Sequence, residues 1–114
     1  MKDEKLSKER RIRKKEEILS VLRRGKKIEN GYLRIYYMER EKDSRIAISV
    51  KRKIVNSVKR NKIRRKLKEI FRKERKEYKK NIDMVVIVKE DISRKEFIKT
   101  KENFNNLLKR REIL

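Results

Sequence analysis

The sequence predicts an α+β fold, with three helices and a single sheet of about four strands in the order α-β-β-β-α-β-α. Three observations lead to this prediction. Apolar residues recur at helical spacing in three separate segments. Runs rich in β-branched and aromatic residues lie between the first two of these segments. The continuous apolar run Met84–Val88 is typical of a central strand that is covered on both faces.

The length of 114 residues predicts one domain, residues 1–114, with a single modest core. Within it, residues 1 to about 13 are expected to form a basic N-terminal segment that need not be rigid. The first helix is expected in "EEILSVLRRG", residues 16–25, because its apolar residues have helical spacing and Gly25 is a good C-terminal cap.

Two of the strands expected after the first helix are placed in "GYLRIYYME" (31–39) and "RIAISV" (45–50). In the second of these, Ile46, Ile48 and Val50 alternate with other residues, as a half-buried strand requires. The charged stretch "REKDS" between the two strands is expected to connect them as a hairpin.

A long helix is expected from about Asn56 to Lys80. At about 100° per residue, the apolar residues fall on one face, which is expected to be buried. These residues are Ile63, Leu67, Ile70 and Phe71. The opposite face carries a basic stripe, with Asn61, Arg65, Lys68 and Arg72 near its centre and Arg64 at its flank.

Charge runs usually form solvated faces in which acidic and basic residues pair along the helix. Between Lys59 and Lys80, however, thirteen basic residues face only three acidic ones, so like charges would repel without an anionic partner. Asn61 has two open interpretations. Its amide can fix one specific nucleotide group, or it can cap the start of the helix if the preceding residues form a separate turn.

The last strand is expected in "NIDMVVIVK", residues 81–89, and the last helix from Ser93 onward. Ser93 is expected to be its N-cap, with Glu96 as the capping-box partner. Phe97, Phe104 and Leu107, followed by Leu108, are expected to form its buried stripe.

The composition favours a polyanionic partner, and nucleic acid before membrane. Forty Lys and Arg against eighteen Asp and Glu give a formal charge of +22, spread through every segment. The chain has no Cys and no His, which excludes disulfides, thiolate nucleophiles and imidazole bases. No run approaches the roughly 20 apolar residues of a membrane span, and no signal sequence is visible, so a cytoplasmic location is expected.

The stretch "ISVKRKIVNSVKRNKIRRKLKEIFR", residues 48–72, resembles the signature of the bacterial ribonuclease P protein subunit. The resemblance extends to "EEILSVLRRGKKIENGYLRIYY" and "IDMVVIVK", so it covers nearly the whole chain. It implies a ribosomal-protein-like two-layer sandwich with a left-handed βαβ crossover, although about 98% of such crossovers are right-handed.

The resemblance also implies a function. The protein would join a catalytic RNA and help it remove the 5′ leader from precursor transfer RNA by endonucleolytic cleavage. No catalytic residue would come from the protein, and Mg²⁺ would be held mainly by the RNA subunit. The partners would be that RNA and precursor transfer RNA, with no membrane and no small-molecule substrate.

The resemblance assigns two groups of site residues. The group expected to bind the RNA subunit is Ser49, Lys51, Arg52, Lys53, Arg60, Asn61, Arg64, Arg65, Lys68 and Arg72. The group expected to line a cleft for the single-stranded leader is Ile18, Leu22, Tyr32 and Tyr36, where aromatic rings would stack on unpaired bases. Periodicity alone assigns Arg60 differently, to packing at the edge of the apolar face, and leaves Tyr36 equally suited to the core.

Four residues depart from the family pattern. Ile18 and Leu22 stand where Phe is often found, Lys62 where Arg is usual, and Val55 where Gly is common. Two rival functions remain to be weighed. A ribosomal or other structural RNA-binding protein would be equally small and basic, while a nuclease acting alone would need convergent carboxylates to hold magnesium.

Overall fold

The computed structural model describes residues 8–114 as four strands, three α-helices and two short 3₁₀ turns, η1 and η2. The helices are α1 (Lys15–Arg24), α2 (Ser57–Glu74) and α3 (Phe97–Arg110). The strands are β1 (Lys26–Glu29), β2 (Leu33–Glu39), β3 (Arg45–Val50) and β4 (Ile82–Val88), with η1 at Lys8–Arg10 and η2 at Arg75–Glu77. The predicted order of helices and strands is confirmed.

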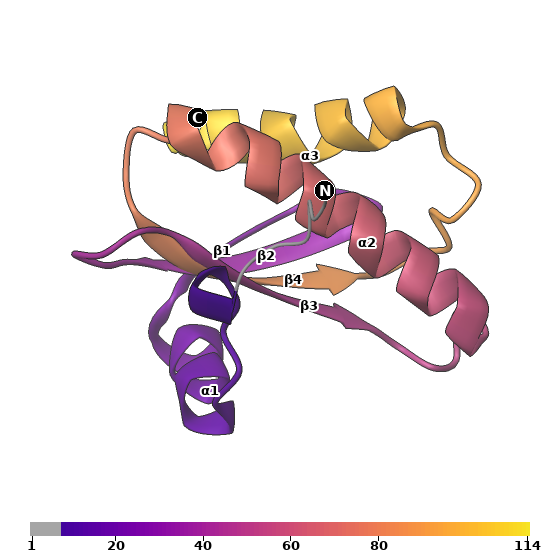
Figure 1. Ribbon diagram of the computed structural model, residues 1–114, viewed down its shortest axis with the longest axis horizontal. Helices are drawn as coiled ribbons and strands as arrows, with labels where there is room; N and C mark the ends of the chain where they lie inside the picture. Colours follow the sequence, from indigo (N-terminus) through magenta and orange to yellow (C-terminus); the bar gives the residue numbers. More distant parts are fainter. Residues whose placement is uncertain (1–7) are drawn as a thin grey trace.

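The four strands form one mixed sheet in the order β1-β2-β4-β3. The β1–β2 and β2–β4 pairs are antiparallel, whereas β3 and β4 are parallel. The chain passes from β3 to β4 through α2 by a left-handed crossover (Figure 1), the rare hand for such a connection.

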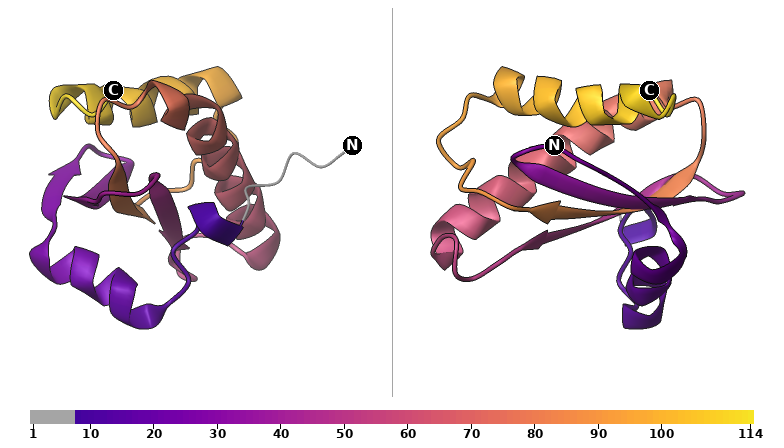
Figure 2. Two further views of the ribbon diagram at one scale, coloured as in Figure 1. Left: turned by 60° about the vertical axis from the view of Figure 1, so that its left-hand side comes forward. Right: turned by 180° about the vertical axis from the view of Figure 1, so that it is seen from behind.

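The helices cover both faces of the sheet unequally (Figures 1 and 2). Helices α2 and α3 lie on one face, and α1 lies on the other, where it contacts β2 and β4. The main core lies between the sheet and the α2–α3 layer, and it includes the whole predicted face of α2: Ile63, Leu67, Ile70 and Phe71 are all buried. Helix α1 presents Val21 on the other face, where Val85 of β4 is also buried.

The hairpin expected between residues 31–39 and 45–50 is wrong. Strands β2 and β3 are not neighbours, because β4 lies between them and pairs with both. The more apolar strand takes the central position: four of the five residues in Met84–Val88 are buried, and only a central strand is covered well enough to bury both faces.

Two helix ends differ from expectation. Helix α2 begins as expected after Asn56, but it ends at Glu74 rather than near Lys80. Tyr78 explains the earlier end, because its ring packs edge-on against Phe71 at 5.9 Å. The backbone N–H of Lys79 then donates to the carbonyl of Ile113 instead of continuing the helix.

Ser93 does not cap α3, which begins four residues later at Phe97. Instead the Ser93 backbone N–H donates to Oδ1 of Asp91 in a turn before the helix. Phe97 is 40% exposed and so does not join the buried stripe, whereas Phe104, Leu107 and Leu108 do.

Gly25 ends α1 as predicted, through lack of space rather than a left-handed backbone. Its φ is −75°, which any residue can adopt. A Cβ at this position would lie 2.4 Å from the Val21 carbonyl oxygen and 2.8 Å from that of Tyr37. Only glycine therefore lets the end of α1 approach β2 this closely.

Candidate RNA interface

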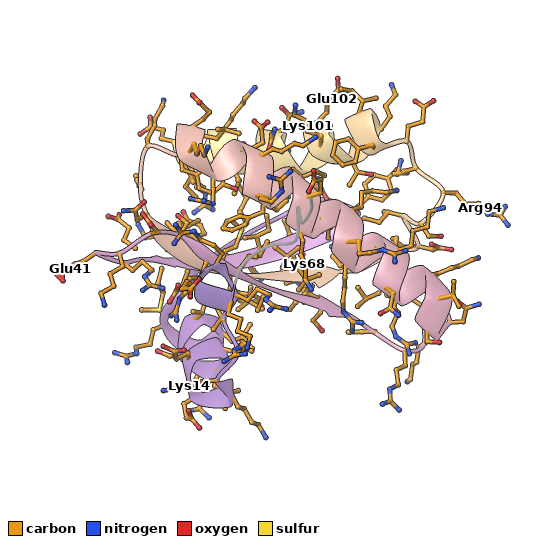
Figure 3. All side chains as sticks on the ribbon, viewed as in Figure 1. Lys14, Glu41, Lys68, Arg94, Lys101 and Glu102 are labelled. Atoms are coloured by element: carbon orange, nitrogen blue, oxygen red, sulfur yellow. The ribbon has the colours of Figure 1, made fainter. Side chains whose placement is uncertain are left out.

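The predicted basic stripe forms the solvent side of α2, opposite the buried face. Asn61 and Arg65 are exposed, and Arg64, Lys68 and Arg72 are partly buried. Lys68 projects from the middle of the helix (Figure 3). The stripe predicted from helical periodicity thus lies away from the buried face of α2.

The side chains of the stripe differ in how they are held. Arg72 donates from Nε and Nη2 to the two carboxylate oxygens of Glu69, at 2.9 and 2.8 Å. Arg64 makes a long contact of 3.4 Å from Nη1 to Oδ1 of Asn61. Arg65 and Lys68 have no ion pair or hydrogen bond with any residue between 8 and 114. These two cations are therefore the most available for phosphate.

Arg11 joins this surface from the N-terminal segment. Arg11 forms an isolated parallel β-bridge with Ile46 of β3 and so lies beside that strand. The pKa of the Lys68 ammonium is lowered by burial and then by the positive charges of Arg11 and Arg64. A nearby anion would favour the charged form of Lys68. The sequence reasoning missed Arg11, because only the pairing of the N-terminal segment with the sheet brings it beside α2.

Arg60 has a different role from its neighbours in the stripe. Its Nη1 donates to the backbone carbonyl of Val55 at 2.9 Å, and Val55 itself is 8% exposed. Arg60 therefore stabilises the turn that enters α2, as its position at the edge of the apolar face predicts.

Lys66, on the same helix, is also held in place. Its Nζ donates to the carbonyls of Ile92 and Lys95, at 3.3 and 2.6 Å. Burial lowers the pKa of this ammonium. Lys66 therefore fixes the connection between β4 and α3.

The loop between β3 and α2 extends the basic surface. Lys51, Arg52 and Lys53 are all exposed, and Ser49 is exposed at the end of β3. Asn56 ends this loop as the N-cap of α2, its Oδ1 accepting from the Lys59 N–H at 2.9 Å. The capping interpretation therefore applies to Asn56, and Asn61 lies within the helix with its amide exposed.

Three of the four predicted cleft residues lie on the α1 side of the molecule. Ile18 and Leu22 are partly exposed on α1. Tyr36 is partly exposed on β2, on the sheet face opposite its buried neighbours Ile35 and Tyr37, and this is the face that α1 covers. The structure therefore provides a surface with two aliphatic side chains on a helix and one aromatic ring on a strand.

Tyr32 does not belong to this surface. The Nζ of Lys95 lies 4.2 Å from the centre of its ring, and the ring borders a small hollow with Thr100 and Asn103 of α3. The Tyr32 N–H donates to Oδ1 of Asn30 in the turn before β2. Because Tyr32 precedes the regular strand, the alternation that would place it beside Tyr36 does not apply.

Residues 8–114 contain neither a carboxylate metal site nor a membrane-spanning helix. No group of three or more Asp and Glu side chains lies close enough together to hold a metal ion. None of the helices in this range has the length and apolar character needed to cross a membrane.

The comparison with protein families decides what this basic α+β sandwich is. The family model described as Ribonuclease P matches residues 6–112. The chain belongs to the ribonuclease P protein family. A ribonuclease P protein component from Dictyoglomus turgidum is 37% identical over 111 residues, covering 94% of this chain and 92% of the relative. That from Thermotoga maritima is 34% identical over 114 residues, covering 96% and 97%.

Solved structures of the ribonuclease P family share the fold. The RNase P protein of Thermotoga maritima superposes with a TM-score of 0.79 at 35% identity, covering 88% of this chain and 96% of that one. The RNase P protein of Staphylococcus aureus superposes with a TM-score of 0.81 at 25% identity, covering 91% and 96%. The likeness therefore covers nearly the whole fold.

Proposed function

We propose that this chain is the protein subunit of a ribonuclease P ribonucleoprotein in the cytoplasm. It binds the catalytic RNA subunit and the 5′ leader of precursor transfer RNA, and it assists the endonucleolytic removal of that leader. Membership of the ribonuclease P family supports this role, and the basic stripe on α2 is the observation that carries it.

The RNA subunit contacts the stripe and the loop before it. Arg65 and Lys68 supply unpaired cations, and Lys51 to Lys53 extend the charge toward β3. Lys and Arg give attraction to phosphate that does not depend on base sequence, whereas the exposed amide of Asn61 both donates and accepts and so selects one group. Arg60 acts indirectly in this arrangement, by fixing the turn through Val55.

The leader binds on the other face of the sheet. Tyr36 offers a ring for stacking on an unpaired base, while Ile18 and Leu22 offer aliphatic contact from α1. Because α1 and α2 lie on opposite faces (Figure 1), the protein can hold the RNA subunit and the leader at separate surfaces.

The hydrolysis itself is assigned to the RNA subunit, with Mg²⁺ held mainly by that RNA. The chain contains no His or Cys, and we assign no catalytic role to any of its residues. The contribution of the protein is to bind and orient RNA, and no small-molecule substrate or membrane takes part.

A structural RNA-binding protein with no role in cleavage is the alternative, and one assay separates the two. Precursor transfer RNA is incubated with a bacterial ribonuclease P RNA at low Mg²⁺ concentration, with and without this protein. We expect site-specific leader removal to be much faster with the protein and absent with the protein alone. An unchanged rate would contradict the proposal, and cleavage by RNA-free protein would contradict its assignment of the chemistry.

A further inference from the structure

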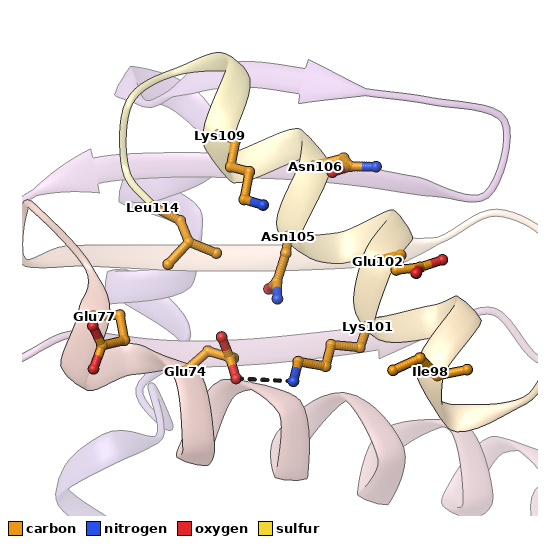
Figure 4. Close-up of a pocket in the computed structure, with 9 residues that line it drawn as sticks. All are labelled: Glu74, Glu77, Ile98, Lys101, Glu102, Asn105, Asn106, Lys109 and Leu114. Carbon is orange, nitrogen blue, oxygen red and sulfur yellow. Dashed lines mark ion pairs between the residues drawn. The ribbon is translucent and has the colours of Figure 1, made fainter.

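Phe97 is an exposed aromatic ring outside both the basic stripe and the surface assigned to the leader. It is the first residue of α3 and is 40% exposed. The Nζ of Lys73, on α2, lies 5.9 Å from the centre of its ring. The next residue, Ile98, is 54% exposed and borders a hollow lined by carboxylates of both helices (Figure 4). The ring therefore lies at the boundary between this hollow and the lysines of α2.

The side of α2 next to this ring carries its own positive charge. At about 100° per residue, Lys62, Lys66 and Lys73 fall within roughly 40° of one another, and about 120° from the centre of the basic stripe. Lys62 is exposed and has no ion pair or hydrogen bond with any residue between 8 and 114. The Nζ of Lys73 lies 3.4 Å from Oε2 of Glu69, a carboxylate that Arg72 also binds. This one carboxylate neutralises only part of the charge.

The segment that carries Phe97 is held in place from both sides. Before the ring, the Nζ of Lys66 donates to the backbone carbonyl of Lys95 at 2.6 Å. After the ring, the Nζ of Lys101 lies 3.3 Å from Oε2 of Glu74, and this ion pair joins α3 to α2 (Figure 4). A ligand at Phe97 therefore meets a segment that is already positioned, which lowers the entropy cost of binding.

Charge and shape together select the class of ligand. The turn before the ring adds Arg94 and Lys95 to the lysines of α2, against one carboxylate, that of Glu96. An unpaired nucleotide offers a flat base and a negatively charged phosphate. Bases of every kind stack on aromatic rings, and lysines attract phosphate without regard to base sequence. An apolar protein segment would cover the ring but leave these cations without a counter-charge.

We propose that Phe97 holds one unpaired nucleotide of the RNA subunit, with the base stacked on the ring and its phosphate at Lys73. This inference rests on the proposed function. The RNA subunit is the partner because the site adjoins the stripe: Glu69 binds both Arg72 of the stripe and Lys73 beside the ring. The surface assigned to the leader lies on the other face of the sheet, with α1 (Figures 1 and 2). Further phosphates of the strand lie along α2 toward Lys62, about 16 Å from Lys73.

A fluorescent reporter tests the stacking in the full chain with a bacterial ribonuclease P RNA. The chain contains no Trp, so Phe97→Trp introduces a single indole. Saturation with the RNA is expected to quench about half of its emission or more, because an indole stacked on a base is quenched. Asn106→Trp is the control, since Asn106 is exposed on the same helix, about 13 Å further along. Equal quenching in the two variants would reject the site.

Substitutions of Phe97 separate stacking from apolar contact. Phe97→Leu keeps an apolar side chain but removes the ring, and it is expected to weaken binding of the RNA about tenfold, as Phe97→Ala does. Phe97→Tyr and Ile98→Ala are expected to bind within about twofold of the unchanged chain. Full affinity in Phe97→Leu would overturn the proposal, and so would a loss in Ile98→Ala equal to that in Phe97→Ala. Melting curves of all four variants verify that the fold is intact.

Failure of this site and failure of the proposed function give different results. If the unchanged chain does not bind the RNA, both are overturned. If it binds tightly while the emission of the Phe97→Trp variant stays constant, the stacking site alone is overturned.

Discussion

Arg45 holds Asp83 at both carboxylate oxygens, with Nε 2.9 Å from Oδ1 and Nη2 2.7 Å from Oδ2. The two residues are register partners on the parallel strands β3 and β4. Arg40, just after β2, reaches the same carboxylate from its Nη1 at 2.9 Å. One carboxylate of β4 thus holds the end of β2 and the start of β3, which precede it by 43 and 38 residues, on the sheet face opposite the main core.

Replacing Asp83 by Ala should therefore lower the free energy of unfolding by about 2–3 kcal/mol. The partly buried Arg40 loses its carboxylate partner, and Arg45 keeps only its longer contacts with Glu17, at 3.2 and 3.3 Å. Chemical denaturation measures the change. Asp43→Ala is the control: Asp43 is 60% exposed and pairs only with Arg10 among the described residues, so the expected loss is below about 1 kcal/mol. Equal losses would show that the shared carboxylate adds nothing.

Replacement by Ala should affect stability at Asn56 and RNA binding at Asn61, although the two residues are only five positions apart. Asn56→Ala removes the N-cap bond to Lys59 and should cost about 1 kcal/mol of stability. Asn61→Ala should leave stability nearly unchanged and weaken binding to the RNA subunit. Melting curves and RNA affinities of the two variants test this together, and a loss of stability in Asn61→Ala would return it to a structural role.

The stripe should contribute to the salt dependence of RNA binding. Changing Arg65, Lys68 and Arg72 to Ala should make log affinity for the RNA subunit less steep in log salt by roughly two to three units. The lower figure is expected if Arg72 remains paired with Glu69. Alanine at the exposed Lys42, Lys76 and Lys99 is the control for net charge, and a slope that falls equally in both variants would show that the stripe is not the contact surface.

Tyr36 should distinguish precursor from mature transfer RNA. If its ring stacks on a leader base, Tyr36→Ala should cost about 1–3 kcal/mol in precursor binding and little in binding of mature transfer RNA. The reconstituted complex is used for both affinities. Tyr37→Ala is the matched control, because Tyr37 is 6% exposed in the main core and its loss should weaken both RNAs together. The assignment fails if the ratio of the two affinities in Tyr36→Ala equals that of the unchanged protein.

Glu29 should make the fold sensitive to acid. Hydrogen bonds from Lys89 and Arg34, both 3.0 Å long to Oε1, lower the pKa of this carboxyl to about 2. Its contribution to stability is therefore fully present above the ordinary pKa near 4.5 and is lost as the pH falls toward 2. Glu29→Gln should lower the melting temperature at pH 7 and match the unchanged protein near pH 2. A difference that persists at pH 2 would point to packing instead.

The buried face of α2 could be predicted because it depends only on local spacing. Ile63, Leu67 and Ile70 follow the helical period, and the same period placed Arg65 and Lys68 on the opposite side. The pairing of strands could not be predicted in this way. The pairing of β2 with β4 depends on contacts between residues 43 to 55 positions apart. The charged connection after β2 carries no signal that distinguishes β4 from β3 as the partner.

In the candidate site, too, features set by local spacing could be predicted, and features set by contacts between distant segments could not. The exposed stripe was predicted from one helix, but the approach of Arg11 to Lys68 required the fold, since the N-terminal segment reaches α2 only through its bridge to Ile46. The resemblance assigned Tyr32 to the same cleft as Tyr36. Alternate residues share a face only within a strand, and because β2 begins at Leu33, Tyr32 lies outside that alternation.

The central position of β4 also determines when the sheet can form during synthesis of the chain. Strands β2 and β3 share no hydrogen bonds and can join one sheet only after residues 82–88 have emerged and entered between them. Until then α2 has every basic residue of the stripe but no completed sheet to pack on. A nascent chain that ends before Ile82 would thus be highly charged yet unable to present that charge as an ordered surface. The basic surface of α2 can therefore become ordered only after β4 has been synthesised and has joined the sheet.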